Sequence, residues 1–297
     1  MQNGYSGEVI REVYTTDTEA EAVREFLVGS GPFKNLYLKF AMKSFQKQLA
    51  YKFEYFIGVF NGLLFIFIFT SLWRSIYSNS EAAEGSGFTS DSIIAYAIFA
   101  MIVRISMSMD DMSTIGKVRS GAISLDLIKP MNYFSMILSE AIGQSMFHWF
   151  TRVVPILAVC LLMFDVSLPV SAANYGLFIV AWTLGYFIMF MINFLFGLIA
   201  FWTIETFSFQ LMKYGLFTLF AGGIVPVDFF PDWARPVVDL LPFKYVLYVP
   251  TALFIGHIGG AEAFKLLVVQ AFWVAGLGFI CWTMWGVAQR KLVVQGG

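Results

Sequence analysis

The chain has 297 residues, of which 58% are hydrophobic and 13% charged, with a formal net charge of −1 and a mean hydropathy of +0.72. Soluble domains carry about a quarter charged residues, so this composition excludes an ordinary soluble protein and indicates one that lies largely within a membrane. The near-zero net charge also lacks the basic excess that nucleic-acid binding requires.

The first 30 residues mix acidic and basic side chains without a long apolar core, which predicts a polar cytoplasmic segment rather than a cleavable signal peptide. Residues 31–53 then carry two stripes at helical spacing. Leu38, Met42, Phe45 and Leu49 fall on one stripe, and Lys39, Lys43 and Lys47 on the other. This pattern predicts an amphipathic interfacial helix, with its apolar stripe at the acyl boundary and its lysines at anionic headgroups. A soluble cytoplasmic helix is the alternative.

Residues 54–291 form the predicted transmembrane domain, and residues 292–297 a cytoplasmic tail. A helix needs about 20 mostly apolar residues to cross the hydrocarbon, and six stretches qualify. The predicted spans cover residues 55–76, 92–109, 135–164, 174–202, 206–226 and 264–289. The fifth is short, because only residues 214–225 are unbroken apolar sequence. The fold class is therefore an all-α integral membrane protein with six transmembrane helices, an N-terminal amphipathic interfacial helix and a short re-entrant helical region between spans five and six.

Lysine and arginine are distributed unequally between the two sides of these spans. Positive residues are retained on the cytoplasmic side of a membrane, chiefly in short segments near span ends. With both termini in the cytoplasm, thirteen cations fall inside, four fall outside, and Arg104 and Arg152 fall within spans. The sequence therefore predicts a multi-pass protein of a bacterial-type cytoplasmic (inner) membrane with both termini cytoplasmic.

Residues 110–130 form the main predicted cytoplasmic excursion, whose first half has the pattern of a short capped helix. The apolar positions are Met112, Ile115 and Val118, the capping candidates Asp110 and Asp111, the cations Lys117 and Arg119, and the punctuating residues Gly121 and Pro130. A helix with an apolar stripe and exposed cations can insert into a groove of another protein, so we expect mechanical contact with a partner here. A simple amphipathic surface turn explains the same pattern equally well.

Four ionisable residues fall within predicted spans, where a charge is costly and is usually paired or functional. They are Arg104, Glu140, His148 and Arg152. His148 and Arg152 are four residues apart on one helical face, and Glu140 lies close to the same stripe. Two interpretations remain open: a polar pathway or headgroup contact, and an interhelical hydrogen-bond network that includes Glu205 or Glu54.

Residues 222–250 contain five of the nine prolines of the chain. Proline breaks helices, and a bilayer tolerates irregular backbone only where protein or a water-filled cavity satisfies it. Pro231 and Pro242 bound a short predicted helix over residues 232–241, and residues 243–255 form a second apolar piece that dips into the interface. The segment therefore predicts a lid or a mouth on the outer side.

Motifs for enzymatic chemistry are missing from the sequence. The phosphate-binding loop of ATPases is not found, since Gly116 and Lys117 are followed by valine and lack the earlier glycine. Asp110 and Asp111 resemble one half of a Mg²⁺–diphosphate site, but no second aspartate-rich cluster accompanies them, and helix capping explains them better. Both cysteines fall within spans, as small apolar residues do. We therefore expect no catalytic residues, no metal and no cofactor on this chain.

The order of these parts resembles that of ABC-2-type permeases, the transmembrane subunits of ATP-binding-cassette exporters. Two motifs carry the resemblance, which covers roughly residues 33–291. The inner motif consists of Arg119, Gly121, Leu125 or Leu127, and Pro130, and the outer motif of Gly223, Pro226, Phe230, Pro231, Leu241, Pro242, Phe243, Pro250 and Gly256. The resemblance indicates architecture and leaves the cargo open.

The resemblance implies that two permease subunits, identical or related, face each other, and that each docks on a separate nucleotide-binding ATPase subunit that holds ATP and Mg²⁺. The residues implied in coupling to the ATPase are Asp111, Met112, Ile115, Lys117, Val118, Arg119 and Gly121. Those implied in the outer re-entrant gate are Pro226, Phe230, Pro231, Pro242 and Phe243. Residues 205–213 would lie beside a second, smaller contact. The chain would export a hydrophobic or amphipathic cargo: a drug, lipid, peptide or glycan-linked molecule.

Two other classes remain as alternatives. An ion-gradient-driven secondary transporter or channel would use Arg104, Glu140 and Arg152 to bind ions or protons, and an inverted repeat would support it. No convincing internal repeat is visible, because the third and sixth spans differ in charge. An intramembrane lipid-modifying enzyme is the third class.

Overall fold

The computed structural model describes residues 34–49, 52–79, 87–129, 131–164 and 171–291, and all of their regular structure is helical. The predicted segments 1–30 and 292–297 lie outside these residues. The helices are α3 (Lys34–Gln48), α4 (Lys52–Asn79), α5 (Ser90–Ser106), α6 (Ser113–Arg119), α7 (Ile123–Leu127), α8 (Tyr133–His148), the π-helical turn η2 (Trp149–Val153), α9 (Val154–Met163), α10 (Ala172–Leu198), η3 (Ile199–Phe201), α11 (Phe207–Phe220), η4 (Val227–Phe229), α12 (Arg235–Leu240), η5 (Phe243–Tyr245), α13 (Tyr248–Phe254) and α14 (Gly260–Gln289). The all-helical class is confirmed for the described part of the chain.

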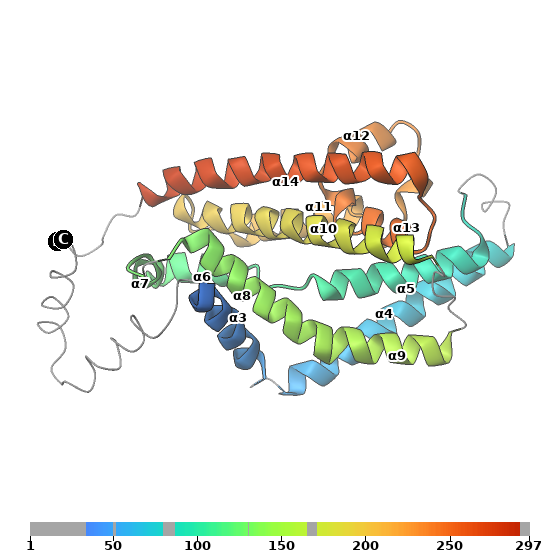
Figure 1. Ribbon diagram of the computed structural model, residues 1–297, viewed down its shortest axis with the longest axis horizontal. Helices are drawn as coiled ribbons and strands as arrows, with labels where there is room; N and C mark the ends of the chain where they lie inside the picture. The colour runs from blue at the N-terminus through green and yellow to red at the C-terminus, as the bar shows by residue number, and fades with distance from the viewer. Residues whose placement is uncertain (1–33, 50–51, 80–86, 130, 165–170, 292–297) are drawn as a thin grey trace, which may run out of the picture.

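Four helices are long and apolar enough to cross a membrane. They are Glu54–Ser78, Tyr133–Met163, Ala172–Phe201 and Gly260–Gln289, which correspond to predicted spans one, three, four and six. They run along the long axis of the molecule, and α8 continues into α9 through η2 (Figure 1). The helices at predicted spans two and five, α5 and α11, have 17 and 14 residues, fewer than the about 20 of a typical crossing.

Helix α10 is the central helix of the bundle. In its most apolar stretch 56% of residues are buried, against 17% to 22% in the other three long helices. Phe190 and Phe194 of α10 contact the ring of Phe134 in α8 at centroid distances of 5.1 Å. On its other side, the buried Gln270 of α14 donates to the backbone oxygens of Ala181 (2.6 Å) and Tyr245 (2.8 Å). The core therefore lies around α10.

Helix α5 ends at Ser106 rather than at residue 109. Trp182 of α10 donates from its indole nitrogen to Ser106 Oγ at 2.7 Å. Trp182 is ten residues from the start of α10 and 16 from its end, so α5 stops part-way along α10. Residues 107–112 continue as a non-helical segment toward α6. Irregular backbone at this depth requires protein partners.

Helix α3 packs across α8 (Figure 1). The two backbones meet at Gly143: a Cβ placed there would lie 2.0 Å from the carbonyl oxygen of Ala41. Ser44 Oγ also donates to the Glu140 carbonyl oxygen at 2.9 Å. Phe45, expected on the lipid-facing stripe, instead packs edge-on against Phe147 of α8. The rest of that stripe is exposed, at Leu38, Met42 and Leu49.

The two ends of the bundle differ. At one end lie α3, α6, α7 and the last turn of α14, and at the other lie α12, α13 and the start of α5 (Figure 1). Lys291, just after α14, lies 5.8 Å from the ring of Trp202, just after η3. We call these the α7 end and the α12 end.

Candidate functional site

The α7 end contains the segment in which the sequence predicted contact with a partner. Lys117 of α6 is half-buried and lies 3.1 and 3.0 Å from the two carboxylate oxygens of Glu140 in α8. It is also 3.0 Å from Asp126 Oδ2 in α7, and Lys129 Nζ is 2.6 Å from the other oxygen of Asp126. Gly121 joins α6 to α7 with φ of +72°, a conformation that favours glycine. These ion pairs fix α6 to α7 and α8.

Arg119 extends this attachment to the connection between α10 and α11. Its Nη2 donates to Thr206 Oγ1 at 2.8 Å and also to the carbonyl oxygen of Ile204. The start of α6 packs on α10 as well, since a Cβ at Gly197 would lie 2.9 Å from Thr114 Cβ. Lys117 and Arg119, which the sequence suggested as exposed docking cations, are therefore engaged within the chain.

Lys213 of α11 binds the segment that precedes α6. Its side chain is 7% exposed, and its ammonium lies 2.6 Å from Asp111 Oδ2 and 2.9 Å from Asn193 Oδ1 of α10. A buried ammonium is stabilised only when a carboxylate and further polar atoms surround it. The segment before α6 is thus bound to both α10 and α11.

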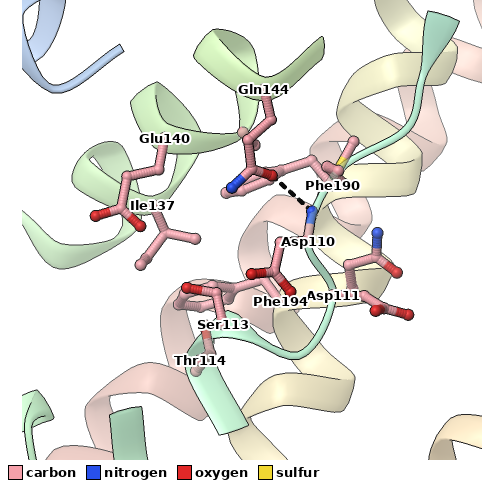
Figure 2. Close-up of a pocket in the computed structure, with 12 residues that line it drawn as sticks. Asp110, Asp111, Ser113, Thr114, Ile137, Glu140, Gln144, Phe190 and Phe194 are labelled. Atoms are coloured by element: carbon pink, nitrogen blue, oxygen red, sulfur yellow. Dashed lines mark hydrogen bonds between the residues drawn. The ribbon is translucent and has the colours of Figure 1, made fainter. Parts of the chain in front are cut away.

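The backbone of this segment is satisfied by α8. Gln144 accepts from the Asp110 amide at 2.6 Å (Figure 2), and Ser145 Oγ donates to the Ser108 carbonyl oxygen at 2.9 Å. Asp110 in turn accepts from the Met112 amide at 3.0 Å, but α6 has Met112 as its N-cap residue and no side-chain cap, so neither Asp110 nor Asp111 caps this helix as predicted. A polar hollow of about 20 Å³, room for one water, lies between these residues and Asn193. Within the described ranges, no group of three or more His, Cys, Asp or Glu side chains could hold a metal ion.

The apolar face of this region differs from the predicted stripe. Met112 is 44% exposed, Val118 is half-buried, and Ile115 is 1% exposed and belongs to the core. Leu125 and Ile128, at 65% and 81% exposed, form most of the free apolar surface instead. Sequence reasoning placed Leu125 only in a motif and missed Ile128, although both follow the α6 stripe in an apolar run.

In the part of the chain that the structure describes, one hydrogen-bond network does not join the four intramembrane ionisable residues, so the network interpretation holds only for the closeness of Arg152 to Glu54. Glu140 binds Lys117, and Arg104 donates to Tyr214 OH of α11 at 3.3 Å. Arg152 packs on Gly58 of α4, where an added Cβ would lie 2.5 Å from its Nε, and it feels the charge of Glu54. Among the described residues, neither His148 Nδ1 nor Arg152 Nε has a hydrogen-bond partner. A charge at the centre of a membrane-spanning helix costs about 2.5–3.5 kcal/mol, so each of these side chains requires polar partners or water nearby.

The α12 end contains the broken helices of residues 222–255. Gly222, with φ of +75°, accepts at its carbonyl oxygen from Tyr96 OH of α5 at 2.6 Å. Helix α12 begins at Arg235 rather than at 232, and η5 and α13 occupy the second apolar piece. Of the predicted gate residues, Pro226, Pro242 and Phe243 are buried, Phe230 is half-buried and Pro231 is exposed.

Asp228 connects the parts of this end. It accepts from Tyr248 OH at 2.8 Å, and its other oxygen lies 3.5 Å from His257 Nε2. Burial disfavours its charge, but the hydrogen bonds from His257 and Tyr248 outweigh burial and lower the pKa of the Asp228 carboxyl. His257 also stacks on Phe88, before α5, at 3.9 Å.

Asp126 provides a pH test of the ion pairs at the α7 end. Burial opposes its ionisation, but hydrogen bonds from Lys129 and Lys117 prevail and lower the pKa of Asp126 below its model-compound value of 3.8. A lowered pKa stabilises the fold at a pH above the pKa of the unfolded state, and the stabilisation disappears as pH falls through the pKa of the folded state.

Asp126→Asn should therefore cost about 1–2 kcal/mol at pH 7. In thermal unfolding scans, the gap from the wild type should close below about pH 4; Asp232→Asn, at a 96% exposed side chain, serves as the control. A gap that stays constant to pH 3 would contradict this.

A bundle of helices that includes four candidate spans defines a multi-pass membrane protein. Residues 59–296 match the family described as ABC-2 family transporter protein, and the chain belongs to this family. No curated protein and no solved structure matches the chain. The chain is therefore the membrane component of an ABC-2 family transporter, in a permease family whose members normally lack an ATPase site of their own. This membership favours the ABC transporter over the ion-gradient carrier and the lipid-modifying enzyme.

Proposed function

We propose that the chain is the permease subunit of an ABC exporter and forms half of a translocation path, with a second, identical or related permease subunit forming the other half. In this proposal α4, α5, α8–α9, α10, α11 and α14 are the six spans of a bacterial-type inner-membrane protein. The α7 end faces the cytoplasm in this proposal. Lys117 and Arg119 in the last turn of α6, and Lys291 just after α14, belong to this end, which supports this orientation. Helix α3 lies at the interface, since its exposed Leu38 and Met42 adjoin exposed lysines.

The attachment of α6 to three spans is the observation that carries this proposal. Lys117 ties it to α8, Arg119 to the connection between α10 and α11, and Asp111, just before α6, to Lys213 of α11. A push on α6 and α7 from an ATPase subunit that holds ATP and Mg²⁺ would reach these spans together. Alternating access needs such a rigid connection to a bistable interface.

The broken helices at the α12 end form the outer gate in this proposal. Polar contacts of Gly222, Asp228 and Asp239 hold them around buried Pro226, Pro242 and Phe243. Rearrangement of these contacts would open the path outward. The cargo would be a hydrophobic or amphipathic molecule, such as a drug, lipid, peptide or glycan-linked compound.

Co-purification tests the proposal. The full chain, expressed with the ATPase subunit of its own operon or host, should retain that subunit and its ATP hydrolysis. Leu125→Asp and Ile128→Asp should each reduce the retained ATPase about tenfold or more, because a buried charge replaces an apolar interface contact. Leu240→Asp is the matched control, since Leu240 is an exposed leucine of α12 at the opposite end. A chain that transports after nucleotide removal, or full retention in both test variants, would overturn the proposal.

A further inference from the structure

Arg104 occupies an unusual depth in the fold. It lies in the last turn of α5, two residues before Ser106, which accepts a hydrogen bond from Trp182 in the middle part of α10. Met107, which follows Ser106, approaches Gly185 of α10. A Cβ added at Gly185 would lie 3.3 Å from the methyl group of Met107. Because α10 is one of the four candidate spans, the backbone of Arg104 lies beside the middle part of a candidate span.

The charge of Arg104 is not neutralised by an acid within the described residues. Its guanidinium donates to Tyr214 OH at 3.3 Å and lies 5.8 Å from the centre of the Tyr214 ring. Asp111 and Glu140 are each paired with a lysine instead. The guanidinium is only partly covered, so several of its five N–H donors remain free to bind another group.

The surface around Tyr214 is apolar. Phe207, Leu211 and Tyr214 are spaced at i, i+4 and i+7 on α11, and they are 70%, 60% and 56% exposed. Arg104 therefore adjoins an exposed apolar stripe on the short fifth helix. A charge beside an apolar surface at membrane depth is the arrangement that an amphipathic molecule would complement.

We propose that Arg104 and Tyr214 bind the anionic group, a phosphate or a carboxylate, of an amphipathic cargo whose apolar part lies along Leu211 and Phe207. This rests on the proposed function, because it places the site in the translocation path. Guanidinium binds phosphate and carboxylate by paired hydrogen bonds, and the tyrosine hydroxyl adds one donor. The site selects against cationic amphiphiles of the same size, since like charges repel.

Equilibrium dialysis of the complex in nanodiscs tests the site, with empty nanodiscs as background. The probes are radiolabelled octyl phosphate, octyltrimethylammonium and inorganic phosphate. Octyl phosphate should bind more tightly than either of the others. Arg104→Gln should weaken its binding about tenfold, and Arg104→Lys about threefold, because lysine keeps the charge and loses the paired geometry. Tyr214→Phe should weaken it about twofold to threefold.

Arg74→Gln is the matched control, because Arg74 is an exposed arginine of α4, and it should leave octyl phosphate binding unchanged. Equal binding of octyl phosphate to the wild type and Arg104→Gln overturns the site, as does tighter binding of octyltrimethylammonium or inorganic phosphate. If Arg104→Gln fails to fold, unchanged binding in both Arg104→Lys and Tyr214→Phe overturns it.

The co-purified ATPase is assayed in the same samples. Loss of the ATPase speaks against the proposed function, whereas a retained ATPase with Arg104-independent phosphate binding speaks against the site alone.

Discussion

Replacement of Gly143 by alanine is expected to force α3 away from α8 and to destabilise the protein strongly. The added Cβ would lie 2.0 Å from the Ala41 carbonyl oxygen and 3.0 Å from Ala41 Cα. These are backbone atoms, so no side-chain rotation relieves the contact, and the whole of α3 must shift. Overpacking of this kind costs about 3 kcal/mol. The hydrogen bond from Ser44 to Glu140 would be lost as well.

Two measurements check this result. Thermal unfolding in detergent should show a lower midpoint for Gly143→Ala, and trypsin should cleave more rapidly at Lys39 and Lys43, which lie on the displaced helix. Gly276→Ala is the matched control, because a Cβ at Gly276 of α14 meets no atom within 4 Å. That change should be neutral or slightly stabilising, as alanine favours helix over glycine by about 1 kcal/mol. Equal stability of the two variants would contradict the close contact of α3 with α8.

The long helices were predictable because each depends on local sequence alone. Uncharged runs of 19 residues or more specify α4, α10 and α14 without knowledge of any partner. The early end of α5 was not predictable, because residues 105–109 are apolar or small and continue the helical pattern. It is set by Trp182 and Ser145, which bind Ser106 and Ser108 from other helices. Contacts between residues so distant in sequence have no local signal.

The partners of the charged residues at the α7 end also have no local signal in the sequence. Cations in a cytoplasmic loop usually face water, so Lys117 and Arg119 were expected on the surface. Their partners, Glu140 and Thr206, belong to separate predicted segments. Only the folded arrangement brings α6 beside both α8 and the start of α11, and it gives Lys117 and the still exposed Arg119 partners within the chain.

One of the two interpretations of the intramembrane charges, a single hydrogen-bond network, depended on helix geometry. Its prediction assumed a regular α-helix from Glu140 to Arg152. The π-helical turn η2 (Trp149–Val153) adds a residue to one turn and rotates Arg152 relative to Glu140. Arg152 therefore faces Gly58 of α4. A π-helical turn has no sequence signature that a periodicity analysis detects.

Removing the carboxylate of Asp111 should cost more than removing its partner Lys213. Asp111→Asn leaves the 7% exposed ammonium of Lys213 without a counter-charge and should destabilise the fold by about 3 kcal/mol. Lys213→Met should cost less, because the Asp111 side chain is 43% exposed and water can solvate it. The double variant, which removes both charges, should recover most of the stability lost in Asp111→Asn. Chemical denaturation of the three variants measures this order.

The same double variant separates stability from coupling. If the Asp111–Lys213 pair makes α11 move with α6 and α7, spin labels on Ser124 of α7 and Leu219 of α11 should keep one distance in the wild-type complex. Pulsed electron paramagnetic resonance should find that distance unchanged between the nucleotide-free and ATP-trapped states. In the double variant α7 should move without α11, so the distance should change on ATP trapping although the protein is folded. Asp232→Asn, an exposed change at the α12 end, should behave as the wild type. An unchanged distance in the double variant would mean that Lys117 and Arg119 suffice to transmit the motion and that the buried pair serves stability alone.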